Sequence, residues 1–167
     1  MDFESKIISR QIGDILYASG YTIGTAESCT GGRISEAIIA IPGSSDYYKG
    51  GVVAYTDEVK EKLLGVSHEV LEEKSAVSEE VAREMVLGTI NTIGVDFAIA
   101  STGVAGPGGG TAEHPVGTIW LAYGNKDEVR TFKLTEDYGR DINLAIATNK
   151  AIRLMLDFLN DMDIKSE

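Results

Sequence analysis

The sequence contains very few residues of the kinds that hold metals and form disulfides. It has one cysteine, Cys29, and two histidines, His68 and His114, among 167 residues. A single cysteine excludes an internal disulfide and a metal site made of Cys-x-x-Cys pairs. Two histidines are too few for a typical histidine-rich zinc centre. We therefore expect a protein that holds no metal.

Basic residues are also scarce. Lysine and arginine number 15 against 26 aspartates and glutamates, and the formal net charge is −11. A nucleic-acid-binding protein usually presents a basic face, so this charge disfavours such a role. A local basic pocket for a single phosphate is still compatible with it.

Long apolar runs are absent as well. Stretches such as residues 95–100 are far too short to span a membrane. The first ten residues, MDFESKIISR, lack the basic and then apolar order of a signal peptide. We expect a cytoplasmic protein that binds neither a membrane nor nucleic acid.

The composition that remains is ordinary for a globular protein, with 43% hydrophobic and 25% charged residues. The length suits one domain over residues 1–167. Helical and strand-like periodicities alternate, and a hairpin pattern follows, which predicts a three-layer α/β/α sandwich with a mixed, mostly parallel sheet. The predicted helices cover residues 3–19, 30–40, 57–64, 68–74, 78–93 and 139–159, the predicted strands cover residues 21–26, 52–55, 95–101, 116–123 and 128–134, and residues 160–167 are a polar, frayed tail.

The stretch YTIGTAESCTGG, residues 21–32, predicts a strand that turns sharply into a helix. Open α/β folds bind ligands at such turns. Ser28 is placed as a nucleophile, and the N–H groups of Cys29, Thr30 or Gly31 could face a developing oxyanion. The alternatives are that Ser28 belongs to a helix N-cap and that Cys29 is either a competing nucleophile or small core filling.

A serine nucleophile needs a base, and neither histidine has an obvious catalytic setting: His68 opens a short helix and His114 lies in a glycine loop. Lys60 stands near the start of a helix, where burial and the helix N-terminus both lower the pKa of a lysine. Parallel neighbouring strands would bring Ser28 and Tyr55 to one sheet edge, with Lys60 following. The alternatives are a solvated Lys60 and a Tyr55 in the core.

A glycine-rich loop, residues 102–115, is long for a compact domain, and such loops are usually functional. Its sequence matches neither GxxxxGK[ST] nor a GxGxxG that opens a helix. We interpret it as a cradle for a phosphate or ribose, with a flexible surface loop as the alternative. Arg140, at the start of the last helix, is a candidate partner for the phosphate or else an exposed surface arginine.

Four ordered motifs, TAESCTGG, PGSSDYYKGGVVAYTDEVK, AVS and STGVAGPGGGTAEHPVGT, resemble the CinA C-terminal domain family over residues 12–159. Members of that family are nicotinamide mononucleotide deamidases. The resemblance implies a stand-alone, cofactor-independent amidohydrolase domain of pyridine nucleotide salvage, assembled as a dimer. It implies Ser28 as nucleophile, Lys60 as base and Tyr55 as the assisting residue. The implied substrate-binding residues are Thr30, Gly31, Ser44, Ser45, Thr102, Gly103, Gly106, Gly108 and Arg140.

Three places depart from the family pattern, and one of them is Lys74-Ser75, before the AVS motif, where glycine is usual. Leu144 stands where the family has the second arginine of a pair that opens the last helix, and His114 stands where its loop usually has lysine. Both changes bear on the substrate and leave the catalytic set intact. The alternative hypothesis is a non-catalytic nucleotide-binding or regulatory domain of the competence/damage-inducible type.

Overall fold

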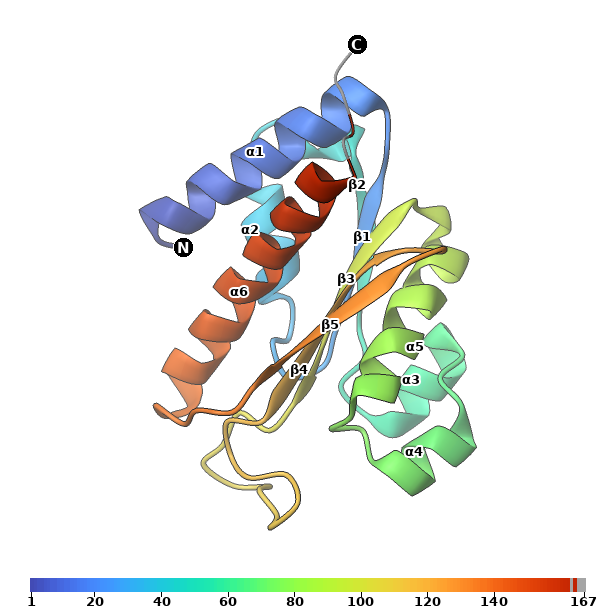
Figure 1. Cartoon of the computed structure of the whole chain (residues 1–167), viewed down its shortest axis with the longest axis vertical. Helices are drawn as coiled ribbons and strands as arrows, with labels where there is room; N and C mark the ends of the chain where they lie inside the picture. The colour runs from blue at the N-terminus through green and yellow to red at the C-terminus, as the bar shows by residue number, and fades with distance from the viewer. Residues whose placement is uncertain (163, 165–167) are drawn as a thin grey trace.

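In the computed structural model, which describes residues 1–162 and 164, a five-stranded sheet forms the centre of the molecule (Figure 1). Its strand order is β2-β1-β3-β4-β5. β1 is parallel to both β2 and β3, whereas β4 is antiparallel to β3 and to β5. Four of the five strands therefore point the same way, which confirms the mixed, mostly parallel sheet. The strands are β1 (Ile23–Glu27), β2 (Tyr48–Val53), β3 (Phe97–Gly103), β4 (Ile119–Asn125) and β5 (Val129–Leu134).

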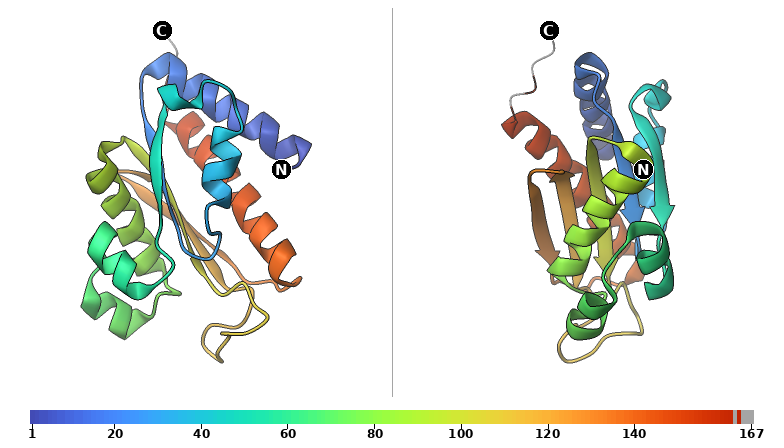
Figure 2. Two further views of the ribbon diagram at one scale, coloured as in Figure 1. Left: turned by 180° about the vertical axis from the view of Figure 1, so that it is seen from behind. Right: turned by 90° about the vertical axis from the view of Figure 1, so that its right-hand side faces the viewer.

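Helices cover both faces of this sheet, so the predicted three-layer arrangement is confirmed (Figure 2). One core cluster lies between the sheet and α1, α2 and α6, and the second lies between the sheet and α3, α4 and α5. The first group of helices is α1 (Phe3–Ser19), α2 (Arg33–Ile39) and α6 (Arg140–Asp161), and the second is α3 (Asp57–Leu64), α4 (His68–Lys74) and α5 (Glu79–Thr89).

Most helices begin and end where the local sequence predicts. The side chains of Thr56, Ser67 and Ser78 each accept a hydrogen bond from the backbone N–H three residues later, which caps α3, α4 and α5. Gly20 and Gly65 end α1 and α3 in the left-handed conformation that glycine adopts without strain. The central strand β3 is buried over nearly its whole length, as its apolar sequence predicts.

The predicted position of β2 is wrong. The strand runs over Tyr48–Val53 and is preceded by a 3-10 turn, Ser44–Asp46, so much of the expected loop is structured and Tyr55 lies beyond the strand. The sequence pattern does not predict the whole strand because it contains two glycines, and glycine has low strand propensity. A Cβ at Gly51 would collide with Thr25 Oγ1, so the close approach to β1 requires glycine there.

Other boundaries shift by a few residues. α2 begins at Arg33 rather than residue 30, because the residues before it form a turn. α5 gives way to a π-helical turn, Ile90–Gly94, before β3 begins, and β4 begins at Ile119 rather than residue 116. α6 continues to Asp161, into the expected tail. The prediction of a frayed end at residues 163 and 165–167 lies outside the described residues.

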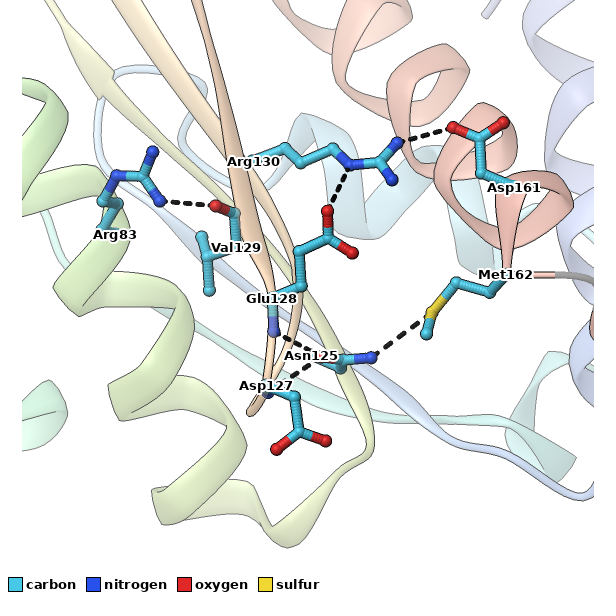
Figure 3. A network of polar contacts seen from close by, with 8 residues as sticks. All are labelled: Arg83, Asn125, Asp127, Glu128, Val129, Arg130, Asp161 and Met162. Atoms are coloured by element: carbon cyan, nitrogen blue, oxygen red, sulfur yellow. Dashed lines mark hydrogen bonds and ion pairs between the residues drawn. The ribbon is translucent and has the colours of Figure 1, made fainter.

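Polar contacts join the end of α6 to the β4–β5 hairpin (Figure 3). Arg130 Nη1 donates to Asp161 Oδ2 at 2.6 Å, and its Nε donates to Glu128 Oε1 at 3.0 Å. Arg83 of α5 donates to the carbonyl of Val129 on the opposite side of the hairpin. These contacts fix the C-terminal end of α6 against the sheet, while its N-terminal end reaches the glycine loop.

Across the described ranges, no helix is both long enough and apolar enough to cross a membrane. Over the same residues, no group of three or more histidine, cysteine, aspartate or glutamate side chains is placed to hold a metal ion.

Candidate active site

The carboxyl ends of three parallel strands meet at one edge of the sheet. Ser28 follows β1, Tyr55 lies two residues beyond β2, and the glycine loop follows β3. This edge is where open α/β sheets bind ligands. A cavity of about 290 Å³ opens there. It is lined by Ser28, Cys29, Tyr55, Gly103, Val104, Ala105, Gly106, Gly108, Gly109 and Arg140.

Ser28 and Lys60 are in direct contact. Lys60 Nζ lies 3.0 Å from Ser28 Oγ, although the residues are 32 positions apart in the chain. The side chain of Lys60 reaches up from α3 and the residue is only 1% exposed. Burial lowers the pKa of the Lys60 amine, and the Asp57 carboxylate, whose Oδ1 lies 3.9 Å from Nζ, partly opposes this shift. A neutral amine in this position can accept the proton of the Ser28 hydroxyl.

Cys29 is the competing nucleophile of the turn. It is 7% exposed and belongs to the core cluster beneath α2 and α6. Burial raises the pKa of its thiol to about 11. The thiolate is the reactive form of cysteine, so Cys29 is a poor nucleophile near neutral pH. The structure therefore favours Ser28, with Cys29 as core filling.

Some backbone N–H groups of the turn after β1 bond within the protein, and others do not. Ser28 N donates to Ser101 O at 2.9 Å, and Gly31 N donates to Ser28 O at 3.2 Å. Among the described residues, the N–H groups of Cys29, Thr30 and Gly32 donate to no other residue. Of these three residues only Cys29 lines the cavity, and Thr30 is fully buried, so the N–H of Cys29 is the one available to a developing oxyanion. The N–H of Gly31 closes the turn.

Tyr55 and Arg140 line the same cavity as Ser28. Arg140 Nη1 donates to Gly106 O at 2.9 Å, and its Nη2 lies 3.4 Å from the Tyr55 hydroxyl. Within the described part of the chain, Tyr55 makes no hydrogen bond to Ser28 or Lys60. Arg140 is the one charged residue among those that line the cavity.

The glycine loop forms one wall of the cavity through Gly103, Gly106 and Gly108, as predicted from its composition. A Cβ at Gly103 would clash with the backbone of Thr118, so only glycine fits where β3 meets β4. Gly106 has φ 85°, a conformation that side-chain-bearing residues rarely adopt. His114 is half-buried in the same loop and does not line the cavity.

The structure does not bring two other expected residues to the cavity wall. Thr30 is fully buried, and its hydroxyl lies 2.7 Å from Glu27 Oε1 and 2.6 Å from Ser101 Oγ. Thr102 is buried as well, and its hydroxyl donates to Ala76 O at 2.8 Å. Successive strand residues point to opposite faces of a sheet, so Thr102 holds the segment before α5 instead.

Ser44 and Ser45 lie at the other end of the sheet. They precede β2, whose first residue Tyr48 is paired with Ile23 at the start of β1. Ser28 follows the end of β1, roughly 16 Å along the strand at about 3.3 Å per residue. Within one chain, these two serines therefore do not share a site with Ser28.

The sequence interpretation missed the part that Glu27 plays. This last residue of β1 is 1% exposed, and its carboxylate accepts four hydrogen bonds, one from Thr30 in the turn that holds Ser28 and three from Ile34 and Ser35 in the first turn of α2. The available signal was a charged residue that ends an apolar strand, followed by a helix whose N-cap, Gly32, has no side chain.

Comparisons with known proteins identify the family of this chain. The family model of the CinA C-terminal domain matches residues 5–159. The chain is 48% identical over 120 residues to the nicotinamide-nucleotide amidohydrolase PncC of Enterobacter agglomerans. That alignment covers 72% of this chain and 73% of the PncC protein. It is 40% identical over 153 residues to a CinA-like protein of Amoebophilus asiaticus. That alignment covers 92% of this chain but only 37% of the longer relative.

Solved structures show the same fold. The crystal structure of the competence/damage inducible protein CihA from Agrobacterium tumefaciens superposes with a TM-score of 0.92 at 36% identity, covering 96% of this chain and 98% of that one. A CinA superfamily protein from Escherichia coli superposes with a TM-score of 0.88 at 36% identity, covering 93% and 91%. The matched region, the shared fold and the ordered motifs show that this chain belongs to the CinA C-terminal domain family.

Proposed function

We propose that this protein is a nicotinamide-nucleotide amidohydrolase that converts nicotinamide mononucleotide to nicotinate mononucleotide and ammonia. The observation that carries the proposal is the 3.0 Å contact between the Ser28 hydroxyl and the almost fully buried Lys60 amine. The similarity to the PncC protein supports the amidohydrolase class and the substrate. We also propose that the protein acts in the cytoplasm as a homodimer, without a cofactor.

The proposed reaction passes through an acyl-enzyme. Neutral Lys60 takes the Ser28 hydroxyl proton as Ser28 Oγ attacks the carboxamide carbon. The N–H group of Cys29 stabilises the oxyanion. The C–N bond then breaks, and Lys60 returns the proton to the leaving nitrogen, which departs as ammonia. Water attacks the ester, again with Lys60 as the base, and releases the carboxylic acid and free Ser28.

Arg140 and the glycine loop supply the proposed nucleotide-binding surface. Arg140 is the cation that faces the cavity, so its guanidinium is the natural partner of a phosphate. Tyr55 is 59% exposed beside it and has an aromatic face and a hydroxyl to offer to the ribose or the pyridine ring. The backbone at Gly106 and Gly108 approaches closely because neither residue has a side chain.

Two single substitutions test the proposed dyad. We expect wild-type protein to release ammonia from nicotinamide mononucleotide, and Ser28→Ala and Lys60→Ala each to lower kcat by at least about 10³-fold, because nucleophile and base act as a unit. Circular dichroism checks folding, and Lys62→Ala, an exposed lysine on the same helix, is the matched control. Full activity in both dyad variants would overturn the mechanism. Tight nucleotide binding without turnover in the wild type would instead favour the non-catalytic alternative.

The Leu144 departure does not support that alternative. Leu144 is 1% exposed and packs in the core beneath α6. The missing second arginine therefore leaves the described cavity wall unchanged. Nicotinamide riboside and glutamine, assayed in parallel, separate a nucleotide amidase from a general amidase, because Arg140 has a phosphate to bind only in the nucleotide.

A further inference from the structure

Glu27 is a buried carboxylate whose two oxygens are both fully engaged. Oε1 accepts from Ile34 N at 2.8 Å and from the Thr30 hydroxyl at 2.7 Å. Oε2 accepts from Ser35 N at 3.0 Å and from the Ser35 hydroxyl at 2.8 Å. No lysine or arginine within the described residues forms an ion pair with it. A buried carboxylate is costly unless it is hydrogen-bonded, and here donors replace a counter-ion.

Through these bonds Glu27 caps the N-terminus of α2, because its carboxylate accepts hydrogen bonds from backbone N–H groups of the first helical turn. The N-cap position of α2 is Gly32, which has no side chain to offer. The free N–H groups of the first turn, at Ile34 and Ser35, bond instead to a carboxylate that belongs to the preceding strand. The start of α2 is therefore tied directly to the end of β1, and the residues between them must close into a tight turn.

The same carboxylate reaches the nucleophile's side of that turn. The Thr30 hydroxyl lies between Glu27 Oε1 and Ser101 Oγ, at 2.7 and 2.6 Å. The backbone carbonyl of Ser101, separately from its hydroxyl, accepts the backbone N–H of Ser28 at 2.9 Å. Glu27 and Ser101 are paired in register on β1 and β3. One side chain thus joins the helix, the turn and the neighbouring strand around Ser28.

We propose that Glu27 is a positioning residue, which holds the residue 28–32 turn so that the Ser28 hydroxyl faces Lys60 and Cys29 lines the cavity with its N–H group. It does not contact the reacting atoms and acts through the turn. The proposal rests on the proposed function for its substrate, but the geometry of Ser28 can be probed independently of that substrate.

Glu27→Gln is the sharpest variant. Glutamine keeps the shape, but its NH₂ group cannot accept, so the donors on that side lose their partner inside the protein. We expect kcat to fall about 100-fold, the scale of effect that a roughly 1 Å misplacement of a reacting group produces. We expect KM to change less than about threefold, because the substrate-facing residues remain in place. A purely structural role would lower the melting temperature and leave kcat of the folded protein unchanged.

Two further variants complete the design. Glu36→Gln removes an exposed carboxylate from the same short helix and serves as the control, with kcat expected within about twofold of wild type. Thr30→Val removes the hydroxyl between Glu27 and Ser101 but leaves the helix cap intact, and we expect a loss in kcat of about tenfold. If Glu27→Gln does not fold, Thr30→Val decides. The proposal would be overturned if folded Glu27→Gln kept a kcat within threefold of wild type. If Glu27→Gln does not fold, the same result in Thr30→Val would overturn it.

A second readout separates this proposal from the proposed function. Phenylmethanesulfonyl fluoride reacts with an activated serine: Oγ attacks sulfur, fluoride leaves and the base takes the proton. Intact-mass measurement gives the labelling rate at Ser28, and we expect Glu27→Gln to slow it as much as it lowers kcat. Labelling that depends on Glu27, without ammonia release, would overturn the substrate only. Ammonia release that is independent of Glu27 would overturn the positioning role only. A wild-type protein that neither is labelled at Ser28 nor releases ammonia would overturn both.

Discussion

Lys60 is a lysine that the fold encloses almost completely. Its amine has Ser28 as its hydrogen-bond partner, and its nearest carboxylate, Asp57, lies 3.9 Å away on an exposed side chain. Burial disfavours the ammonium form and so lowers the pKa of Lys60. Asp57 acts in the opposite direction, since a negative charge favours the ammonium.

Asp57→Asn should move the acidic limb of the activity profile to lower pH. The neutral amine is the active form, so kcat/KM rises as pH increases through the pKa of Lys60. Removing Asp57 removes the charge that raises this pKa, so the same fraction of neutral amine is reached at a lower pH.

The pH profile of kcat/KM measures the effect. Glu58→Gln is the matched control, because Glu58 also lies in the first turn of α3 and does not perturb Lys60. Both substitutions weaken the favourable interaction with the helix dipole by a similar amount. A limb that stays in place in Asp57→Asn, or that moves equally in Glu58→Gln, would contradict the assignment of Lys60 as the base.

At the scale of elements, α4 ends on a strained residue. Ser75 has φ 68° and ψ 159°, a region that is essentially restricted to glycine. Such a conformation costs about 1–3 kcal/mol, and surrounding contacts hold it in place. Ser75 O accepts from the Ser78 hydroxyl, and Ser75 Oγ accepts from Val77 N. The strain sits beside Ala76, whose carbonyl bonds to Thr102.

Ser75→Gly should stabilise the protein by about 1 kcal/mol, because relief of the strain exceeds the loss of one part-buried hydrogen bond. Ser75→Ala keeps the strain and loses the same hydrogen bond, so this control should be less stable than wild type. Urea denaturation measures both. A glycine variant no more stable than the alanine variant would show that the backbone at Ser75 is unstrained.

At the scale of the whole molecule, the packing of α6 decides what the Leu144 position can do. The family pattern places an arginine there, which suggests a phosphate contact. In this protein α6 lies along the sheet with Leu144 inside the core and Arg140 at the cavity. The two positions are one helical turn apart, yet only Arg140 projects beyond the layer of the core.

Leu144→Arg should therefore destabilise the protein by at least about 3 kcal/mol, because it buries an unpaired charge. It should not lower KM for the nucleotide. Ile142→Arg is the control on the same helix: this residue is 54% exposed, so the substitution should cost about 0.5 kcal/mol or less. A stable Leu144→Arg protein with a lower KM would show that the new guanidinium reaches the cavity.

Local patterns predicted most of the fold. Capping residues marked the starts of α3, α4 and α5, and an apolar run marked β3, because these signals act within a few residues of the chain. The strand β2 escaped prediction, since its glycines are required by contact with Thr25 on the neighbouring strand. The contact between Ser28 and Lys60 followed from one topological premise, that β1 and β2 are parallel neighbours, and the structure confirms that premise.

Sequence patterns place several functional groups wrongly, because the positions of these groups depend on how distant strands and helices pack together. Thr102 was assigned to the pocket, but a strand shows alternate residues to opposite faces, and sequence spacing does not say which face a given residue takes. Ser44 and Ser45 were assigned by motif, whereas the parallel pairing of β2 with β1 puts them at the far end of the sheet. Glu27 was passed over because its partners are donors of the next helix.

The sequence by itself determined the class of the protein: an acidic α/β domain with one cysteine, few histidines, a serine at a strand-to-helix turn and a glycine loop. It also determined which residues were chemically able to act. The tertiary structure alone decided which of them do so. The reason is desolvation: the pKa of Lys60 is lowered, as the proposed base requires, and the pKa of Cys29 is raised, because packing from several distant segments removes water from both.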